Sequence, residues 1–419
     1  MDALKKIIVK PSTLSGEIKI SGAKNSVLRI LATSILTSEV IFLENYPSGL
    51  LDAKVHVEML ECLGKNCSQV NETISINESK SLSDFLEYDG RSIRNTLLIL
   101  GALTARKGRG SVPLPGGCKL GERKHDLHIM LLENLGAKVW ESEDRIYAEA
   151  PTGGLIGADI FLPFRSTGAT ENAIICGTLA KGITRIWNPH IRPEIIDLIN
   201  LLKKMGAEIE IRGQESIIVK GKEGLNGCSH YVMPDNIEAL TWLVGCAITD
   251  GDLLLHDFPF EHLEVPLIYL RESGVKLYKE GSSAIIRGGN LYPIDISTGP
   301  YPGINSDMQP ILAILGAVAN GNSHIIDLRF PGRYGYMKEL AKMGVNHEIK
   351  GNLLRINGGK LLHGCDVNAL DLRAGASLLL AGLIAKGKTT INNAWQIERG
   401  YNNLERKLAE LNIDCSFEY

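Results

Sequence analysis

The 419-residue sequence has no long apolar run. Charged residues stand at positions 2, 5 and 6, no apolar signal-peptide core follows them, and no uncharged stretch of about 18 residues occurs later. This pattern argues against a membrane-spanning helix and a secretion signal. We therefore expect a soluble cytoplasmic protein without a membrane partner.

Basic residues are not in excess. The chain has 45 Lys and Arg against 48 Asp and Glu, which gives a net charge of −3. Proteins that bind nucleic acid without sequence preference depend on a basic face, so this class is disfavoured. A local cationic pocket remains compatible with the balance, and we expect neither a nucleic acid nor an obligate protein as partner.

Common metal and nucleophile signatures are also missing. The eight cysteines are scattered, with no Cys-x-x-Cys pair and no Cys/His cluster at zinc spacing. There is no phosphate-binding P-loop, no His-Glu-x-x-His and no Gly-x-Ser-x-Gly. His125, Asp126 and His128 are a weak metal signal that a solvated helix start explains better. We expect reduced cysteines and no metal.

Aromatic residues are few, at 6%, whereas glycine is abundant, with 44 residues. This composition favours aliphatic cores and tight turns, and it accompanies an internal repeat. Six segments each open with small or polar residues, continue as an apolar helix, and end in a turn before a β-branched strand. The six helices are expected at 23–36, 94–106, 168–180, 235–249, 307–320 and 373–386.

Each repeat, roughly 70 residues long, also contains a second, amphipathic helix. These helices are expected at 58–63, 131–135, 201–205, 268–273, 337–343 and 404–411. Each ends at a residue that tolerates the left-handed conformation after a helix, namely Gly64, Gly136, Gly206, Gly274, Gly344 and Asn412.

The first helices are almost uncharged, and 311–318 and 378–384 read as buried on all sides. The second helices carry charges and belong outside. Each repeat is therefore predicted to be a β-α-β-α-β-β module, and three modules around one axis close a domain. The alternative is an ordinary doubly wound sheet.

Three repeats per half divide the chain near residue 233. We predict one domain at 23–233 and another at 234–419, completed by residues 1–22, because a strand at 17–20 precedes the first repeat. A binding site is expected in the cleft between the halves, where the starts of the buried helices converge.

Polar residues gather at the starts of the buried helices. They are Lys24, Asn25, Arg94, Ser166, Thr167, Gly168, Asp235, Asp307 and Arg373. Cations there oppose the helix dipole, which an anionic ligand would explain; solvated charge on a surface turn is the alternative. Asp307 is either a plain N-cap or a general base for a hydroxyl.

The loop at 114–123 has three glycines within six residues and contains Cys118 beside Lys119 and Arg123. A thiol in a positive field ionises more readily and can act as a proton donor or nucleophile. The alternative is an inert buried cysteine. Arg333, after Phe330, and Arg399 add further loop cations.

Arg333 and Arg399 make a set of five cations together with Lys24, Arg123 and Arg373. They suit a substrate that bears both a carboxylate and a phosphate.

Several motifs resemble the enolpyruvyl transferases. They are Ile-Ser-Gly-Ala-Lys-Asn at 20–25, Leu-Pro-Gly-Gly-Cys at 114–118, Gly-Ala-Thr-Glu-Asn at 168–172, Ser-Asp-Met-Gln at 306–309, Asp-Leu-Arg-Ala at 371–374 and Arg-Gly-Tyr at 399–401. The resemblance covers essentially the whole chain and is closest to the branch that acts on UDP-N-acetylglucosamine.

The resemblance implies two inside-out α/β barrels of three repeats each. It also implies transfer of the enolpyruvyl group of phosphoenolpyruvate to the 3-hydroxyl of UDP-N-acetylglucosamine, a step of peptidoglycan and hence cell-wall synthesis. The family reaction releases phosphate through a tetrahedral ketal and uses no metal or cofactor.

The resemblance also implies roles for single residues. Cys118 would protonate the methylene carbon of phosphoenolpyruvate and be the thiol that fosfomycin alkylates, and Asp307 would take the proton of the acceptor hydroxyl. The remaining residues would contact the substrates: Lys24, Arg123 and Arg399 would hold phosphoenolpyruvate, with Arg94, Phe330, Arg333 and Arg373 nearby, and Asn25 would touch the sugar.

Departures from the family pattern fall on the nucleotide side. The usual Arg-Pro-Val-Asp-Leu is Arg123-Lys124-His125-Asp126-Leu127, and the usual Ser-Val-Gly is Ser166-Thr167-Gly168 after Arg165. A lysine expected near position 51 and a Trp expected at 98 are both leucines, and the usual Arg/Lys-Glu-Pro-Glu is Ile191-Arg192-Pro193-Glu194.

These departures leave the acceptor open. Lys124, Arg165 and Arg192 suit a terminal phosphate, so the runner-up is the same chemistry on the 3′-hydroxyl of UMP, an activity of nucleoside-antibiotic pathways. A third alternative is a non-catalytic nucleotide-binding paralogue.

Overall fold

The computed structural model describes residues 5–91, 93–114 and 125–419. It divides into two compact units. Unit 1 consists of Met1–Ser21, Gly49–Leu51 and Pro234–Tyr419, and unit 2 of Gly22–Ser48 and Asp52–Met233. The sequence predicts domain boundaries after residues 22 and 233. It does not predict that Gly49–Leu51 belongs to unit 1.

The six apolar helices predicted from the repeat are confirmed. Unit 2 contains α1 (Lys24–Thr33), which continues as η1 (Ser34–Leu36), α3 (Thr96–Lys107) and α5 (Thr167–Gly177). Unit 1 contains α7 (Asn236–Ile248), α9 (Gln309–Val318) and α11 (Leu372–Ile384). In α9 and α11 every residue but the last is buried, so the expected burial on all sides is also confirmed.

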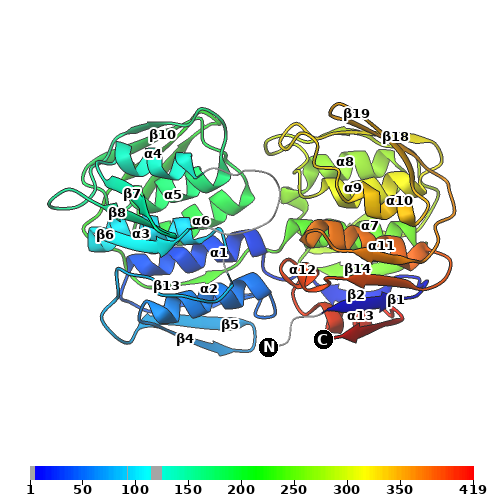
Figure 1. Cartoon of the computed structure of the whole chain (residues 1–419), viewed down its shortest axis with the longest axis horizontal. Helices are drawn as coiled ribbons and strands as arrows, with labels where there is room; N and C mark the ends of the chain where they lie inside the picture. The colour runs from blue at the N-terminus through cyan, green and yellow to red at the C-terminus, as the bar shows by residue number, and fades with distance from the viewer. Residues whose placement is uncertain (1–4, 92, 115–124) are drawn as a thin grey trace. The chain divides into compact units, whose positions relative to one another are not determined.

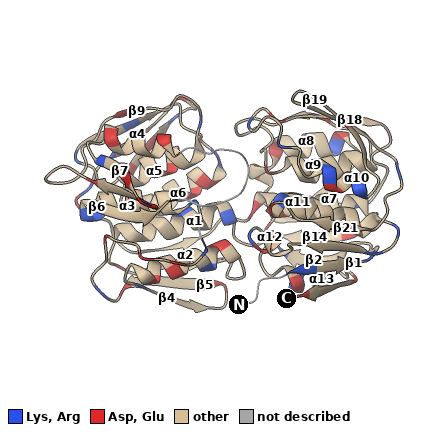
Figure 2. Ribbon diagram, viewed as in Figure 1, with Lys and Arg blue, Asp and Glu red and all other residues tan. Residues whose placement is uncertain are grey.

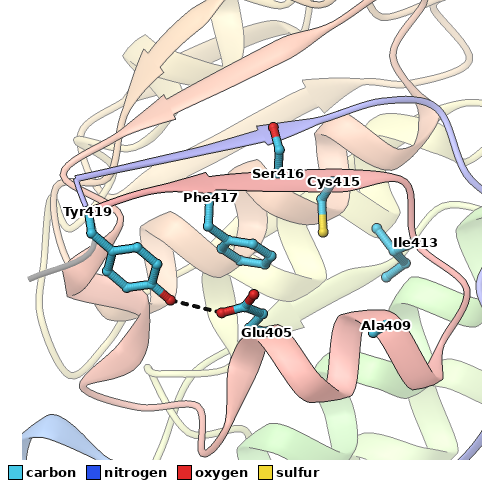
Figure 3. A pocket seen from close by; sticks show the side chains of 7 residues that line it. All are labelled: Glu405, Ala409, Ile413, Cys415, Ser416, Phe417 and Tyr419. Atoms are coloured by element: carbon cyan, nitrogen blue, oxygen red, sulfur yellow. Dashed lines mark hydrogen bonds between the residues drawn. The ribbon is translucent and has the colours of Figure 1, made fainter.

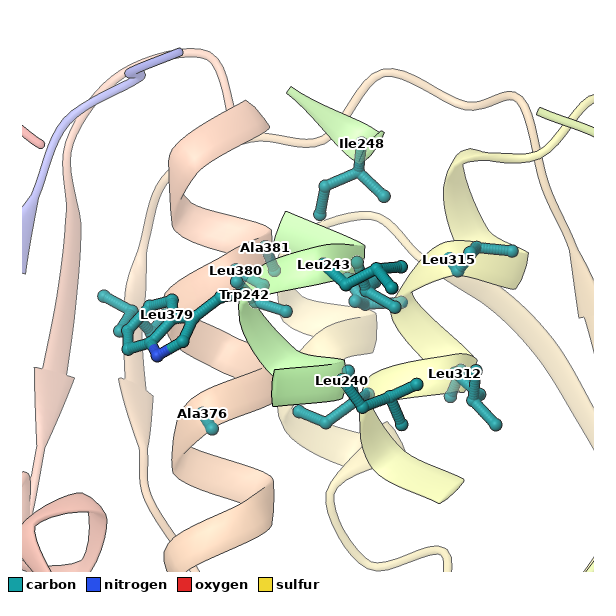
Figure 4. Close-up of a cluster of buried hydrophobic side chains, with 14 of the residues drawn as sticks. Leu240, Trp242, Leu243, Ile248, Leu312, Leu315, Ala376, Leu379, Leu380 and Ala381 are labelled. Carbon is teal, nitrogen blue, oxygen red and sulfur yellow. The ribbon is translucent and has the colours of Figure 1, made fainter. Parts of the chain in front are cut away.

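These helices form the centre of each unit. In unit 1, α7, α9 and α11 lie side by side (Figure 1) and contact one another pairwise. Leu243 of α7, Leu315 of α9 and Leu380 of α11 belong to the shared cluster in Figure 4 and are fully buried. Burying each such leucine contributes roughly 1.5–3 kcal/mol. In unit 2, α3 contacts α1 and α5.

Sheets form the second component of both units, and each four-stranded sheet has one parallel and two antiparallel strand pairings. The strand orders in unit 1 are β2 (Ser15–Lys19), β14 (Asp252–His256), β16 (Ser283–Arg287), β15 (Lys276–Glu280); β17 (Asp295–Ser297), β18 (Asn322–Ile326), β20 (Leu353–Asn357), β19 (Asn346–Lys350); and β21 (Asp366–Asn368), β22 (Thr389–Asn392), β1 (Lys6–Val9), β23 (Cys415–Glu418). The orders in unit 2 are β13 (Cys228–Tyr231), β3 (Ile41–Glu44), β5 (Thr73–Glu78), β4 (Lys65–Val70); β9 (Asp159–Phe161), β10 (Ile183–Trp187), β12 (Ser216–Lys220), β11 (Glu208–Arg212); and β6 (Arg109–Pro113), β8 (Arg145–Glu149), β7 (Lys138–Ser142).

Two strands are exchanged between repeats, and this explains where the chain passes from one unit to the other. β2 precedes α1 in the chain but pairs in parallel with β14, which follows α7. β13 precedes α7 but pairs in parallel with β3, which follows α1. The chain therefore leaves unit 1 after Ser21 and returns after Met233.

The amphipathic helices are present in all six repeats. They are α2 (Leu51–Cys62), α4 (Asp126–Asn134), α6 (Pro193–Lys204), α8 (Glu264–Glu272), α10 (Met337–Lys342) and α13 (Leu404–Glu410); the short η2 (Phe260–His262) and α12 (Trp395–Glu398) lie between them. The six expected turn residues all have positive φ, from 58° at Asn412 to 102° at Gly64. Charged residues of both signs are spread over these helices and the sheets (Figure 2). No helix among the described residues is long and apolar enough to span a membrane.

Candidate functional site

Lys24 is the first residue of α1 in unit 2. Its Nζ lies 3.0 Å from Oδ2 of Asp52, in the first turn of α2, and the two side chains are only 10% and 4% exposed. The carboxylate offsets a cation that the dipole of α1 disfavours. Lys24 is therefore not the solvated charge of the alternative interpretation, and Asn25 beside it is partly buried.

The predicted residues before α3 and at the start of α4 differ in how far they are exposed. Arg94 is partly buried in the turn before α3. His125 is the N-cap residue of α4, with Nε2 2.6 Å from Oε1 of Glu141. Asp126 is exposed, whereas Leu127 is buried in the core. Among the described residues 125–127 of the predicted nucleotide-binding segment, Leu127 is therefore not accessible to a ligand.

Four of the predicted residues lie at the start of α5. Ser166 is its N-cap and accepts a hydrogen bond from the Ala169 N–H, and Arg165 donates weakly to Oδ1 of Asn188 at 3.4 Å. The hydroxyl of Thr167 lies 2.8 Å from Nδ1 of His190. Thr167 stands where the family pattern has an apolar residue, and His190 gives its hydroxyl a partner. Gly168 follows as the second helical residue.

Arg192 was expected as an extra cation for a terminal phosphate. In the structure its guanidinium donates to both carboxylate oxygens of Glu194 at 2.6 Å, and the two side chains are 13% and 2% exposed. Burial raises the pKa of Glu194, but Arg192 outweighs it, so this pKa lies below its ordinary value. Glu194 therefore neutralises the cation locally.

In unit 1, Asp307 lies between two arginines. Its Oδ1 is 2.8 Å from a terminal nitrogen of Arg333, and its Oδ2 is 4.0 Å from Nε of Arg373. The N-cap residue of α9 is Met308, with no side-chain cap, so the plain N-cap interpretation of Asp307 is wrong. The carboxylate is instead the centre of a charge cluster and is 28% exposed.

Arg373 is the most unusual member of this cluster. It is fully buried, and none of its three guanidinium nitrogens has a hydrogen-bond partner among the described residues. Its Cζ lies 5.2 Å from the ring centroid of Tyr401. Burial lowers the pKa of Arg373, but Tyr401, Asp235 and Asp307 outweigh it and raise the pKa above its ordinary value. A buried cation with unsatisfied donors is costly, which favours an anion close by.

The other two predicted residues of unit 1 lie in loops. Arg399, 9% exposed, donates to Oε1 of Gln396 at 3.1 Å. The N–H of Phe330 donates to Oδ1 of Asp327, and its ring centroid is 5.7 Å from Cζ of Arg333. Asp327 and Tyr401 were not predicted. Tyr401 could have been noticed beside Arg399 in the Arg-Gly-Tyr motif.

The predicted acid Cys118, with Arg123 and Lys124, lies outside the described residues. Within them no group of three or more His, Cys, Asp or Glu could hold a metal ion. A hollow of about 370 Å³ in unit 1 lies between α13 and β23 (Figure 3). It is lined by Glu405, Tyr419 and their neighbours and contains none of the predicted site residues.

Comparison with known proteins defines the class to which this fold and these residues belong. Residues 8–408 match the family model of EPSP synthase (3-phosphoshikimate 1-carboxyvinyltransferase), and the chain belongs to this family of enolpyruvyl transferases. Two curated relatives are named UDP-N-acetylglucosamine 1-carboxyvinyltransferase 1. The protein of Caldanaerobacter subterraneus subsp. tengcongensis is 40% identical over 97% of both chains, and that of Staphylococcus aureus is 38% identical over 98% of both.

Solved structures agree on the fold. The enolpyruvyl transferase NikO from Streptomyces tendae matches with a TM-score of 0.90 and 26% identity over 99% of both chains. An EPSP synthase from Acinetobacter baumannii, 18% identical, matches with a TM-score of 0.77 over 99% of this chain and all of its own. The expected fold class, with its repeated α/β modules, is confirmed, and the doubly wound alternative is excluded.

Proposed function

We propose that this enolpyruvyl transferase uses UDP-N-acetylglucosamine as its acceptor and phosphoenolpyruvate as its donor. The names of the curated relatives, 38–40% identical over almost the whole chain, support this acceptor. The observation that carries the chemistry is the cluster of Asp307, Arg333 and Arg373 in unit 1, in which the guanidinium nitrogens of Arg373 have no hydrogen-bond partner among the described residues.

The proposed reaction is an addition followed by an elimination. Asp307 takes the proton of the 3-hydroxyl, whose oxygen bonds to C2 of phosphoenolpyruvate, while Cys118 gives a proton to C3. The ketal then loses a C3 proton and expels phosphate, so the carbon–carbon double bond returns and no redox partner is needed. Lys24, Arg123 and Arg399 hold the donor, because cations stabilise its carboxylate and departing phosphate.

Asp307 needs a way to become a base, since Arg333 stabilises its ionised form. In the proposed complex the carboxylate of phosphoenolpyruvate competes for the guanidinium groups of Arg333 and Arg373. Because Arg333 and Arg373 then pair more weakly with Asp307, the carboxylate of Asp307 becomes more basic when phosphoenolpyruvate is bound.

Transfer to UMP remains the second candidate. Arg165, partly buried beside the start of α5, favours it, because a nucleoside monophosphate presents a doubly charged terminal phosphate there. Arg192 supports it less than expected, since Glu194 binds its guanidinium. A non-catalytic nucleotide-binding role is the third candidate.

One assay separates the three candidates. Phosphate release from phosphoenolpyruvate is measured with UDP-N-acetylglucosamine or with UMP as acceptor. Release with UMP alone contradicts the proposed acceptor, and no release with either nucleotide favours a binding protein. Cys118→Ser should sharply reduce turnover and prevent alkylation by fosfomycin; unchanged turnover would remove Cys118 from the acid role.

A further inference from the structure

His128, on α4 in unit 2, has a defined tautomer. The side-chain nitrogen of Asn172 donates to the carbonyl oxygen of Leu97 at 3.2 Å and lies 3.0 Å from Nδ1 of His128. A carbonyl only accepts, so the amide nitrogen of Asn172 faces both groups and Nδ1 must accept as well. The ring proton of the neutral imidazole is therefore on Nε2.

The edge of the ring that carries Nε2 faces the start of α5. A Cβ placed on Gly168 would lie 3.2 Å from Nε2 and 3.3 Å from Cε1. Gly168 is the second residue of the 11-residue helix α5, where backbone N–H groups have no partner within the helix. The residues described here provide no acceptor for Nε2 of His128, although the residue is only 6% exposed.

The preceding repeat contains a similar Asn–His pair beside another core helix, since Asn95 is the N-cap residue of α3. The side-chain nitrogen of Asn95 donates to the carbonyl oxygen of Leu28 at 2.9 Å and lies 3.5 Å from Nδ1 of His56. His56 is fully buried, and its Nε2 is enclosed without a partner. The Asn–His pair thus recurs in both repeats, but the second ring nitrogen of His128 lies beside Gly168 at the start of α5, whereas that of His56 is enclosed.

The environment also sets the charge of the ring. Burial, with smaller effects of Arg94 and His125, lowers the pKa of His128 to about 3. The imidazole is neutral near pH 7 and is a hydrogen-bond donor rather than a cation. A neutral donor beside free helix N–H groups is suited to a phosphate oxygen, which accepts several N–H bonds at once.

We propose that His128 is an acceptor-binding residue that donates from Nε2 to a phosphate oxygen of the nucleotide at the start of α5. This inference rests on the proposed function, because it assumes a phosphorylated nucleotide as acceptor. The proposed contact in unit 2 is a hydrogen bond from a neutral side chain, so it requires no positive charge.

A pair of substitutions isolates the Nε2 donor. Asn at position 128 keeps an acceptor for Asn172 where Nδ1 was and removes the Nε2–H, whereas Gln places an amide donor near the Nε2 position. We expect His128→Asn to raise the KM for UDP-N-acetylglucosamine by about tenfold or more, since a hydrogen bond to a charged group contributes about 1.5–3 kcal/mol. The KM for phosphoenolpyruvate should stay within about twofold, and His128→Gln should recover part of the loss.

His56→Asn is the matched control, because it makes the same change at a buried imidazole that does not face α5. Its KM for the acceptor should match that of the wild type. A wild-type KM in His128→Asn, an equal rise in the Asn and Gln variants, or an equal rise in His56→Asn would each overturn the proposal.

Direct binding keeps this test separate from the proposed reaction. Calorimetric titration with UDP measures nucleotide affinity without turnover. If the wild-type protein binds UDP, and His128→Asn weakens binding while His56→Asn does not, the role of His128 stands even where no acceptor is turned over. Equal affinity in the wild type and His128→Asn, or no binding of UDP to the wild type, would refute it. If His128→Asn does not fold, Gly168→Ala replaces it, since its Cβ crowds the same ring edge and should also weaken binding.

Discussion

The two units hold their polar groups in different ways. In unit 1, one carboxylate, that of Asp307, meets two buried arginines, and Arg373 keeps three unsatisfied nitrogens. In unit 2, two cations near helix starts have a carboxylate partner, Lys24 in Asp52 and Arg192 in Glu194. The polar group of unit 2 that we assign to the acceptor is the Nε2–H of the neutral imidazole of His128, whose Nδ1 lies 3.0 Å from the side-chain nitrogen of Asn172.

This difference suggests a division of labour. Unsatisfied buried cations are suited to stabilising charge that develops during a reaction, because the low dielectric around them strengthens the interaction. Neutral hydrogen-bond donors are suited to a ligand group whose charge stays the same during the reaction. Apart from Leu51, the departures from the family pattern, such as Thr167, fall in unit 2, as expected if the acceptor varies while the chemistry does not.

The largest effect is expected at the carboxylate of unit 1. Asp307→Asn removes the proposed base but keeps the size of the side chain, and kcat should fall by about 10²- to 10⁴-fold. Steady-state phosphate release measures it. Asp295→Asn, at an exposed carboxylate of the same unit paired with His324, is the control and should retain full turnover. A loss below about tenfold in Asp307→Asn would mean that the charge cluster is structural.

A second prediction concerns the buried charges of unit 1 away from the cluster. Lys407 and Glu238 form an ion pair with side chains 2% and 1% exposed, and Trp242 donates to the same carboxylate. Lys407→Met leaves Glu238 charged and buried, so the free energy of unfolding should fall by about 3–5 kcal/mol. Urea unfolding followed by tryptophan fluorescence measures the change.

The matched control is Lys10→Met. Lys10 pairs with Asp414 at the surface of the same unit, with both side chains 60% exposed, so the expected cost is below about 1 kcal/mol. Equal costs for the two variants would show that burial does not raise the cost of leaving a charge unpaired in unit 1.

The helices and strands of both units can be predicted from the sequence more completely than the side-chain pairs of the candidate site. The core helices were predictable because burial on all sides leaves a continuous apolar run, as in α9, and because Gly64 and its equivalents mark helix ends locally. The pairing of Lys24 with Asp52, or of Arg373 with Tyr401, joins residues far apart in the chain, so no local pattern reveals it. Asp307 was ambiguous because its sequence neighbours allowed an N-cap. The structure excludes that role, since α9 begins after Met308, and it places Arg333 beside the carboxylate.

Acid should act first on unit 2, which contains both buried histidines with a pKa near 3, His56 and His128. In the unfolded chain their pKa is about 6.5, so below that pH the unfolded state binds protons that the folded unit does not. Stability is therefore lost as the pH falls from about 6.5 towards 3, by up to about 1.4 kcal/mol per pH unit for each histidine.

Urea midpoints between pH 7 and 5 measure this loss. His56→Gln removes one of the two groups while the carboxylates stay the same, so its midpoint should depend less steeply on pH than that of the wild type. An unchanged dependence would show that His56 takes up its proton without unfolding, and the neutral character assigned to unit 2 would no longer hold.

The smallest expected effect tests whether a departure in unit 2 alters acceptor binding. Thr167→Val restores an apolar residue of the same shape and removes the hydroxyl that lies 2.8 Å from Nδ1 of His190. A neutral hydrogen bond contributes about 1 kcal/mol, so the KM for UDP-N-acetylglucosamine should change by about fivefold at most, with kcat and the KM for phosphoenolpyruvate unchanged. The reason is that Thr167 orients His190 and does not itself carry charge. Steady-state kinetics with both acceptors measure the change. If the variant instead loses UMP binding by more than about tenfold while its affinity for UDP-N-acetylglucosamine rises, the Thr167–His190 pair selects the acceptor, and UMP becomes the favoured substrate of the reaction that unit 1 preserves.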